Sequence, residues 1–368
     1  MYYDKIDYDT IELSWEILKR EIKLPYIIHL VGTNGKGSTG RYLSSFLLQE
    51  KKTVLHYSSP HIINFNERIW INGENVSTAL LESVHKKLLS ILSNELIEKL
   101  TYFEYTTLLG LYLSSGKDYL VLEAGLGGEF DATNVVKNDL SIITTIGLDH
   151  QSFLGNTVEE IARTKMKSCD NSFILSTQVF DEVIKVKNEI LSDKFEIKRK
   201  KYLCDKNKAI LDLAEYLQEN LQVVFRVLEY LGFTEKRYTL PKLQGRFEKF
   251  RPNIIVDVGH NPLAAQAIAN ELKKENKKII LVYNSFKDKD YQKVLEILYP
   301  YIKEIQIIKC KDDRIVEKSF LLKFIDSLGL KSKDFDIINL KTEENYLVFG
   351  SFLVVENFLK GYTSYEKR

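Results

Sequence analysis

The glycine-rich stretch VGTNGKGSTG, residues 31–40, constrains the fold more than any other part of the sequence. It begins at the last residue of the apolar run YIIHLV and continues into a helical pattern that extends from Gly37 to Leu48. A strand, a glycine-rich turn and a helix in this order form a phosphate-binding loop, in which backbone N–H groups and the positive helix end face an anion. The residues expected around the phosphates are Thr33, Asn34, Gly35, Lys36, Gly37 and Ser38, with Lys36 reaching the outer phosphates.

The loop departs from the usual pattern G-x-x-x-x-G-K-[ST] at two positions. Leu30 stands in place of the first glycine. Gly37 stands in place of the Ser or Thr whose hydroxyl normally binds Mg²⁺. We therefore expect the metal ligands at neighbouring strand ends, since ligands of open α/β sheets gather there. Ser59, Glu123 and His150 each close an apolar run and are the candidates. A turn residue, a structurally paired carboxylate and a loop residue are the respective alternatives.

Apolar runs alternate with helical patterns in both halves of the chain. Near-continuous apolar runs are typical of strands buried on both faces of a parallel sheet. A second alternating block begins near Asn253, and the stretch TLPKLQGRFEKFRP before it is a plausible hinge. We predict an α/β protein in which a P-loop parallel-sheet ATPase domain, residues 1–248, precedes a smaller Rossmann-like α/β domain, residues 249–368, with a cleft between them.

The overall composition is that of an ordinary globular protein: the 368 residues are 44% hydrophobic and 28% charged, with a formal net charge of +1. No extended basic field suggests nucleic acid. Cys169, Cys204 and Cys310 lack a paired spacing, so neither a disulfide framework nor a cysteine zinc site is indicated. We find no targeting segment and no apolar window of membrane-spanning length. We expect a cytoplasmic monomer that binds small molecules and neither nucleic acid nor membrane.

Two smaller features carry local predictions. RIWINGENV, with Asn72-Gly73 at its centre, predicts a hairpin. Between Asn171 and Tyr202 the periodicity weakens and lysines accumulate, so we expect poorly packed surface structure with a solvated charge run there.

The stretch TVEEIARTK predicts a helix that carries a lysine on its apolar face. Thr157 and Glu160 form a capping box. The residues that share one helical face are Val158, Ile161, Ala162 and Lys165. An inward ammonium is costly unless it is paired, and a depressed pKa would expose a neutral amine that can react with CO₂. A salt-bridged helix lysine is the alternative, and position alone favours it.

A second strand-to-helix junction lies in the C-terminal block. Asn261 is the expected N-cap of a helix with Pro262 in its first position, which places Asp257 and His260 at the junction.

These motifs together resemble the folylpolyglutamate synthase and dihydrofolate synthase family, relatives of the Mur ligases. The resemblance covers most of the chain and rests on GTNGKGS (32–38), YSSPHIINFNERIWING (57–73), TYFEYTTLL (101–109), VLEAGLGGEFDATNVV (121–136), TTIGLDHQSFLGNTVEEIARTK (144–165) and VDVGHNPLAA (256–265). It implies an ADP-forming ligase that uses ATP to phosphorylate a carboxylate, after which the amine of L-glutamate displaces the phosphate. The acceptor would be dihydropteroate, reduced folates or both.

The resemblance also implies roles for individual residues. Metal ligands in the family match Ser59, Glu123 and His150, and a carbamylated lysine that supports a second Mg²⁺ matches Lys165. The implied catalytic residues are Lys36, Lys165, His150, Asp257 and His260.

The remaining implied contacts concern the nucleotide and the acceptor. Asn220 matches an adenine contact, Arg246 a phosphate or base contact, and Asp257 and His260 lie near the nucleotide in the family. The implied pterin-site residues are Thr101, Phe103 and Asp131, although aromatic residues in a helical stretch are more often core.

The sequence departs from the family after Lys165, where MKSCD replaces small and apolar residues, and after Asn220, where Leu221 and Gln222 replace small ones. Two other functions compete with the ligase. A P-loop phosphoryl transferase or NTPase would share only the nucleotide site and would not need Lys165. A non-catalytic nucleotide-binding protein should lack a metal ligand, and none is missing.

Overall fold

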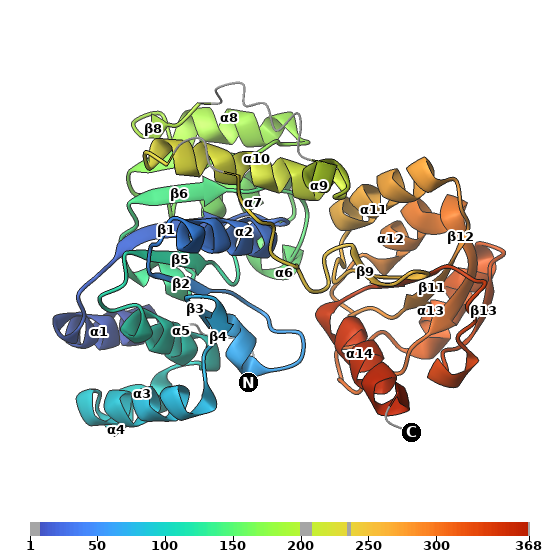
Figure 1. The fold of residues 1–368 in the computed structure, drawn as a ribbon, viewed down its shortest axis with the longest axis horizontal. Coiled ribbons are helices and arrows are strands. Elements are labelled where there is room, and N and C mark those ends of the chain that lie inside the picture. Colours follow the sequence, from blue (N-terminus) through green and yellow to red (C-terminus); the bar gives the residue numbers. More distant parts are fainter. Residues whose placement is uncertain (1–7, 199–207, 234–236, 367–368) are drawn as a thin grey trace. The chain divides into compact units, whose positions relative to one another are not determined.

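The computed structural model describes residues 8–198, 208–233 and 237–366. They form two compact units, which Figure 1 colours along the chain. Unit 1 falls within Met1–Gly147, Asn156–Asp212 and Leu217–Pro241, and unit 2 within Leu148–Gly155, Leu213–Tyr216 and Lys242–Arg368. The predicted boundary between residues 248 and 249 stays a prediction. Two short segments from before residue 248, 148–155 and 213–216, belong to unit 2.

Unit 1 is built on a mostly parallel sheet with the strand order β4-β3-β2-β5-β1-β6-β7-β8. Its strands are β1 (Tyr26–Val31), β2 (Val54–Tyr57), β3 (Ile69–Ile71), β4 (Glu74–Asn75), β5 (Tyr119–Glu123), β6 (Leu140–Ile143), β7 (Ser172–Leu175) and β8 (Phe195–Glu196). Only the β2–β3 and β3–β4 pairs are antiparallel. The β3–β4 pair confirms the predicted hairpin around Asn72-Gly73. β1 runs between β5 and β6, so the chain enters the glycine-rich loop from the middle of the sheet.

The helical segments of unit 1 cover both faces of this sheet. They are α1 (Tyr8–Leu18), η1 (Lys19–Glu21), α2 (Lys36–Gln49), η2 (Phe65–Arg68), α3 (Thr78–Ile91), α4 (Asn94–Lys99), α5 (Tyr102–Leu113), η3 (Ala132–Val135), α7 (Val158–Met166), α8 (Asp181–Ile190), α9 (Lys208–Leu211) and α10 (Glu215–Tyr230), whose first two residues belong to unit 2.

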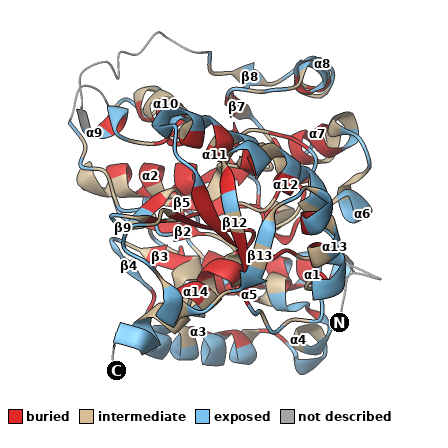
Figure 2. Ribbon diagram, turned by 90° about the vertical axis from the view of Figure 1, so that its right-hand side faces the viewer, coloured by how far each residue is buried: buried red, intermediate tan, exposed pale blue. Residues whose placement is uncertain are grey.

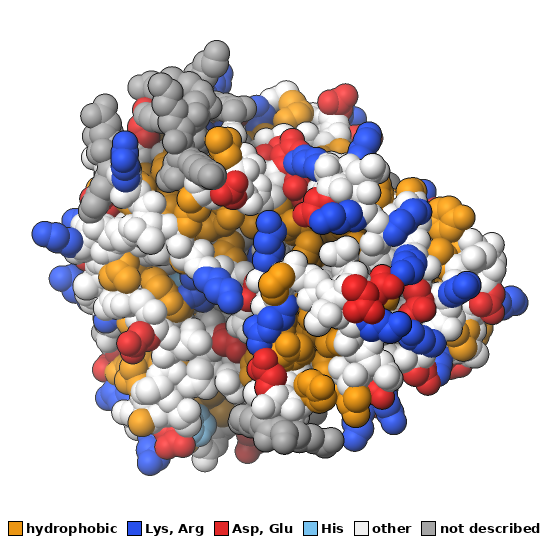
Figure 3. Space-filling model, turned by 45° about the vertical axis from the view of Figure 1, so that its right-hand side comes forward, with side chains coloured by type: hydrophobic (Ala, Val, Ile, Leu, Met, Phe, Trp, Pro, Cys, Tyr) orange, Lys and Arg blue, Asp and Glu red, His pale blue; other side chains and the backbone are white. Residues whose placement is uncertain are grey.

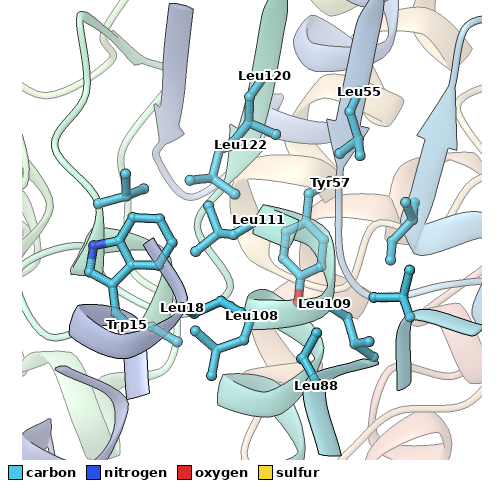
Figure 4. Packing of buried hydrophobic residues seen from close by; sticks show 14 of the residues in the cluster. Trp15, Leu18, Leu55, Tyr57, Leu88, Leu108, Leu109, Leu111, Leu120 and Leu122 are labelled. Atoms are coloured by element: carbon cyan, nitrogen blue, oxygen red, sulfur yellow. The ribbon is translucent and has the colours of Figure 1, made fainter. Parts of the chain in front are cut away.

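One face of the sheet packs against α1, α3 and α5. Alternate strand residues, including Ile27, Leu55, Tyr57, Leu120 and Leu122, join side chains of these helices in one buried cluster. Figure 4 shows the β2 and β5 side chains pointing toward those of the three helices. Because successive side chains of a strand point to opposite faces, the intervening residues lie on the other side.

The opposite face is covered by α2 and α10. His56 of β2 lies on this face, and its ring approaches Gly40 of α2 so closely that a Cβ there would be 2.5 Å from Nε2. The rings of Phe46 on α2 and Phe225 on α10 lie 5.8 Å apart and join the two helices. The helix that follows the glycine-rich loop therefore packs against both the sheet and α10.

The prediction of poorly packed structure between residues 171 and 202 was wrong for its described part. β7 and α8 form there, with Phe173, Ile174, Val183 and Val186 buried. α8 is amphipathic, so its lysines on the outer face masked the short apolar stripe in the sequence. Residues 199–202 lie outside the described residues.

Unit 2 contains a second sheet, with the strand order β13-β12-β11-β14-β10-β9. Its elements are α6 (Gln151–Leu154), β9 (Glu248–Arg251), β10 (Ile254–Val256), α11 (Pro262–Glu275), β11 (Ile279–Tyr283), α12 (Tyr291–Leu298), η4 (Tyr299–Tyr301), β12 (Ile302–Ile307), α13 (Lys318–Ser327), β13 (Lys331–Asp334), η5 (Ile337–Asn339), β14 (Tyr346–Phe349) and α14 (Phe352–Glu366). All pairs are parallel except β9 with β10. In Figure 2 the buried residues concentrate on the strands, and the helices keep exposed outer faces.

The surface shows no large region of one charge on the face drawn in Figure 3, where lysine and arginine side chains are interspersed with aspartate and glutamate. No helix in residues 8–198, 208–233 and 237–366 combines the length and apolar character that a membrane crossing needs.

Candidate active site

The glycine-rich loop forms the predicted strand–turn–helix. β1 ends at Val31, and α2 begins at Lys36. Gly35, the N-cap, has φ +91°, and no side chain caps the helix start. Gly32 has φ +148°, and a side chain there would overlap Thr144. The first N–H groups of α2 therefore remain available for an anion, as a phosphate site requires.

Thr33 and Asn34 brace the loop. Their backbone N–H groups both donate to the carbonyl oxygen of Thr145, at 2.9 and 3.1 Å. The Thr33 hydroxyl donates to the Gly147 carbonyl at 2.9 Å and accepts from the Gly147 N–H at 3.0 Å. These two residues fix the loop to the chain after β6, so the donors for a phosphate come from the start of α2.

Lys36 lies folded over the loop that it belongs to. Its ammonium donates to the carbonyl oxygens of Gly32 at 2.9 Å and Thr33 at 3.4 Å. Both partners are uncharged, so a phosphate would bind the ammonium more strongly than they do.

Asn220 of α10 contacts the end of the glycine-rich loop and the first turn of α2. Its Nδ2 donates to the Ser38 hydroxyl at 3.0 Å. Its Oδ1 lies where a side chain at Gly35 would have to go, because a Cβ there would be 2.7 Å away. The structure thus brings this sequence-predicted nucleotide contact to the start of α2.

Ser59 and Glu123 lie at the carboxyl ends of neighbouring strands of the sheet. Ser59 comes after β2, Glu123 ends β5, and Glu123 lies in register with Leu30 of β1. The carboxyl ends of β1, β2 and β5 therefore meet at one edge, next to the glycine-rich loop. Glu123 is 5% exposed. A hydroxyl and a carboxylate oxygen are ligands that Mg²⁺ accepts, so these two residues fit a magnesium ion.

The described residues offer no ready-made cluster of three or more His, Cys, Asp or Glu side chains for a metal. A cation at the edge formed by Ser59 and Glu123 would therefore need water or phosphate oxygens as further ligands, which is usual for magnesium at nucleotides.

Arg41 is a partly buried cation near Glu123 that the sequence interpretation left out. Its guanidinium lies 4.8 Å from the centre of the Trp70 ring. Burial lowers the pKa of Arg41 to about 10, while the charges of Glu123 and Glu67 act in the opposite direction. The Glu123 carboxylate therefore has a cationic neighbour on α2.

Lys165 points inward, as predicted, with 4% of its surface exposed. The capping box formed by Thr157 and Glu160 is also present. The glycine-rich turn after β5 lies directly on this part of α7. A Cβ at Gly128 would be 2.8 Å from the Lys165 Cα, and the Glu129 N–H donates to the Thr164 carbonyl at 2.7 Å.

His150 belongs to unit 2, on the segment 148–155. It has φ +51°, which is uncommon outside glycine. Its Nε2 lies 3.3 Å from the Lys289 ammonium. Burial lowers the pKa of His150 to about 4, so the ring is neutral, the form that can bind a metal.

Asp149 attaches this segment to unit 2. Lys289 donates to its Oδ1 at 2.6 Å, and Asn261 donates to its Oδ2 at 3.1 Å. His260 Nε2 lies 3.5 Å from Oδ2. Burial raises the pKa of Asp149, but His260, by its hydrogen bond and its charge, and then Lys289 lower it well below the usual range.

The junction after β10 matches its prediction: Asn261 caps α11, and Pro262 occupies its first turn. Asp257, 5% exposed, accepts hydrogen bonds from the Phe247 and Gly259 N–H groups at 2.8 and 2.7 Å. Asp257 thus holds the backbone directly after Arg246 and directly before His260.

Arg246 and His260 themselves are only partly buried. The Arg246 guanidinium lies 5.1 Å from the centre of the Phe352 ring, and His260 Nδ1 lies 3.1 Å from the Val258 carbonyl oxygen.

The three predicted acceptor-site residues all lie in unit 1. Thr101 caps α5 in a capping box with Glu104. The Phe103 ring occupies the space in front of Gly125, so a side chain at Gly125 would overlap it. Asp131, 7% exposed, accepts from the Leu126 N–H at 2.6 Å and the Thr133 N–H at 3.0 Å.

Four polar residues escaped the sequence interpretation: His29 and Lys289, which are buried, and Arg41 and Asp149, which are partly buried. Asp149 stands next to His150 in the motif 144–165, and Arg41 directly follows the glycine-rich stretch 31–40, so their proximity to predicted site residues was an available signal. Lys289 sits in FKDKDYQK, where a charged run gives no sign of burial.

The fold and the loop define a class. Two largely parallel α/β sheets in one chain, the first with a phosphate-binding loop, are the architecture of an ATP-dependent ligase of the Mur type. Curated relatives identify the family. The dihydrofolate synthase/folylpolyglutamate synthase of Haemophilus influenzae is 30% identical over 97% of this chain and 95% of its own length. The enzyme of the same name from Buchnera aphidicola subsp. Acyrthosiphon pisum is 34% identical over 91% and 89%. The chain belongs to the dihydrofolate synthase/folylpolyglutamate synthase family.

Solved structures agree with this assignment. Folylpolyglutamate synthetase of Helicobacter pylori is 38% identical, with a TM-score of 0.76 and 98% and 96% of the two chains covered. E. coli FolC in complex with DHPP and ADP is 26% identical, with a TM-score of 0.84 and coverage of 99% and 95%. A bifunctional enzyme with Mn, AMPPNP and L-glutamate bound is 25% identical, with a TM-score of 0.80 and coverage of 97% and 94%. No protein-family model matches the sequence.

Proposed function

We propose that this chain joins L-glutamate to dihydropteroate, to reduced folates or to both, at the expense of ATP. The relatives carry both activities in their names, and similar structures hold DHPP with ADP, or AMPPNP with L-glutamate. The observation that carries the proposal is the uncapped start of α2 beneath Lys36, with Asn220 against it. This arrangement binds a nucleotide phosphate and positions its outer end.

The chemistry proceeds in two displacements. The acceptor carboxylate attacks the γ-phosphorus of ATP, which forms an acyl phosphate and releases ADP. The glutamate amine then attacks the acyl carbon, inorganic phosphate leaves, and the nitrogen loses one proton as the amide forms. Lys36 and the first N–H groups of α2 stabilise the negative charge that gathers on the transferred phosphoryl group.

Divalent metal is part of the proposal. Ser59 and Glu123 would hold one magnesium ion at the edge formed by β1, β2 and β5, and His150 is the third proposed ligand on the strength of the sequence resemblance. A carbamylated Lys165 would support a second ion. When bound, the metal neutralises the phosphates so that a second anion can approach them.

Further roles complete the proposal. Asn220, Arg246, Asp257 and His260 would bind the nucleotide, with Asp257 acting chiefly by fixing the backbone around its neighbours. Thr101, Phe103 and Asp131 would bind the pterin end of the acceptor. We also propose a cytoplasmic monomer that binds neither nucleic acid nor membrane.

A product assay tests the function. The purified chain is supplied with Mg²⁺, ATP and L-glutamate, with dihydropteroate and tetrahydrofolate offered separately, and mass spectrometry identifies the products. We expect ADP release to require both acceptor and glutamate, and the mass of the acceptor to rise by one glutamyl residue. ADP release at the same rate without acceptor would instead support a P-loop NTPase.

A further inference from the structure

His29 is a buried histidine in the middle of unit 1 to which the proposed reaction assigns no role. It lies on β1, three residues before the first glycine of the phosphate loop, and is 1% exposed. Side chains alternate along a strand, so His29 shares a face with Ile27, the face that packs against α5 and η3. Its Nε2 lies 2.8 Å from the hydroxyl oxygen of Thr133 in η3.

The hydrogen bonds of Thr133 determine which ring nitrogen of His29 carries the proton. The Thr133 hydroxyl donates to Asp131 Oδ1 at 2.6 Å. A hydroxyl has one hydrogen, so its oxygen must accept from His29, and His29 must hold its proton on Nε2. Nδ1 is then a bare acceptor, and it is buried without a hydrogen-bond partner among the described residues. Burial lowers the pKa of His29 to about 4 against the opposing charge of Asp131, so the ring stays neutral.

The same chain of hydrogen bonds limits what Asp131 can still bind. A carboxylate has about four acceptor positions. Oδ1 receives both the N–H and the hydroxyl of Thr133, whereas Oδ2 receives, among the described residues, only the Leu126 N–H. The remaining acceptor position is therefore on Oδ2, and its orientation is fixed by the contacts to Oδ1.

We propose that His29 is a positioning residue, which acts through Thr133 to hold Asp131 so that Oδ2 can accept a hydrogen bond from a ring N–H or amino group of the acceptor. The inference rests on the proposed function, because Asp131 is an acceptor-site residue only there. Loss of the His29 N–H leaves the Thr133 hydroxyl free to turn, and Asp131 is then held only by the Leu126 and Thr133 backbone N–H groups, which fix its orientation less firmly. The effect falls on acceptor binding and leaves the nucleotide site unchanged.

Kinetics of matched variants test the role. His29→Phe keeps an aromatic ring but removes the donor, and His29→Gln keeps an N–H at a similar reach. We expect His29→Phe to raise the acceptor KM about tenfold, the effect of one lost hydrogen bond to a fixed group, with the ATP KM within about twofold of the wild type. His29→Gln should recover most of that loss. Thr133→Val should resemble His29→Phe, and the double variant should be little worse than either single one.

His56→Leu is the control, because His56 is another 1%-exposed histidine on the neighbouring strand and neither of its ring nitrogens has a hydrogen-bond partner in the described chain. Its acceptor KM should stay within about twofold of the wild type. An equal rise in His29→Phe and His56→Leu would mean general damage to the sheet and would overturn the proposal.

A spectroscopic measurement separates this inference from the proposed function. In ¹⁵N-histidine-labelled full-length protein, His29, assigned from its absence in His29→Gln, should show the Nε2–H tautomer. A proton on Nδ1 would overturn the proposed hydrogen bonds from His29 to Thr133 and from Thr133 to Asp131, whatever the activity of the enzyme. The correct tautomer with an unchanged acceptor KM in His29→Phe would overturn the positioning role alone. If the wild type forms no glutamylated product, both the proposed function and the role of His29 in acceptor binding are wrong. The spectrum still decides whether His29 donates to Thr133.

Discussion

Asn220 Nδ2 and Ser38 Oγ lie 3.0 Å apart, so the start of α2 is tied to a side chain 182 residues further along the chain. Replacing Asn220 by Ala removes this hydrogen bond and leaves space beside Gly35. We expect the KM for ATP to rise about tenfold, because the loop loses one buried hydrogen bond that fixes it, with a smaller change in the acceptor KM. Gln222→Ala, another amide on α10, is the control. Equal effects on both KM values would argue against a specific role at the nucleotide.

Lys36 is the cation that can reach the transferred phosphoryl group. Lys36→Ala should lower kcat/KM by ~100-fold or more, because charge stabilisation in the transition state is lost. The fold should be preserved, since the hydrogen bonds of the ammonium within the described part of the chain go to two loop carbonyl oxygens. Steady-state ADP release and circular dichroism measure the two properties. Lys87→Ala is the control, because it removes a lysine from the exposed face of α3. A near-wild-type rate in Lys36→Ala would show that the loop lysine takes no part in the mechanism.

Lys165 is proposed to carry a carbamate. Lys165→Ala should lose most activity, and high bicarbonate or a short carboxylate such as acetate should restore part of it. The wild type, equilibrated with ¹³C-bicarbonate, should show a carbamate carbon signal that Lys165→Ala lacks. Lys167→Ala is the control, because Lys167 lies just beyond the same helix and pairs with Glu129 at the surface. Full activity in Lys165→Ala without additives would leave this lysine a structural role only.

Local signals in the sequence were sufficient for several parts of this site. A strand, a glycine-rich turn and Lys36 determine the phosphate loop through backbone geometry alone, so the sequence predicted it. The inward direction of Lys165 followed from a capping box and helical periodicity, which are also local. Ser59 and Glu123 were predicted to lie together because parallel strands present their carboxyl ends at one edge.

The parts that escaped prediction depend on contacts between distant residues. The segment that carries His150 belongs to unit 2 because Asp149 binds Lys289, 140 residues away, and no periodicity encodes such a pair. The partnership of His29 with Thr133, 104 residues apart, is equally invisible in the sequence. Both depend on which side chains the finished sheets bring together.

Gly128 lies against the backbone of α7, and this contact sets the distance between the turn after β5 and Lys165. A Cβ at Gly128 would lie 2.8 Å from Cα and O of Lys165, and backbone atoms of a helix cannot turn aside as a side chain can. Gly128→Ala should therefore destabilise the protein by ~1–3 kcal/mol and lower activity. Calorimetry and the product assay measure these effects.

The matched control for Gly128→Ala is Gly361→Ala. Gly361 lies within α14, and an added Cβ there meets nothing within 4 Å. This substitution should be neutral or stabilise by up to ~1 kcal/mol, because alanine loses less entropy in a helix. A stable, fully active Gly128→Ala would show that the turn can move away from α7 without consequence.

Buried histidines should make unit 1 sensitive to acid. The pKa of His29 is about 4 in the folded chain, because burial disfavours the charged ring, against about 6.5 in the unfolded chain. Between these values the unfolded state binds a proton that the folded state does not, so stability is fully present above about pH 6.5 and decreases as the pH falls toward 4. Burial, and then the charge of Arg41, lower the pKa of His56 well below its usual value. His56 should therefore also make the unit less stable as the pH falls.

Each such histidine should lower the free energy of unfolding by up to ~1.4 kcal/mol per pH unit in this range. Both tryptophans, Trp15 and Trp70, lie in unit 1, so their fluorescence during urea unfolding at about pH 7 and about pH 5 reports on this unit. His29→Gln cannot take up the proton, so its difference in stability between the two pH values should be smaller than that of the wild type. His85→Gln, on the exposed surface of α3, should keep the wild-type difference. The same difference in His29→Gln as in the wild type would show that His29 does not stay neutral through its burial.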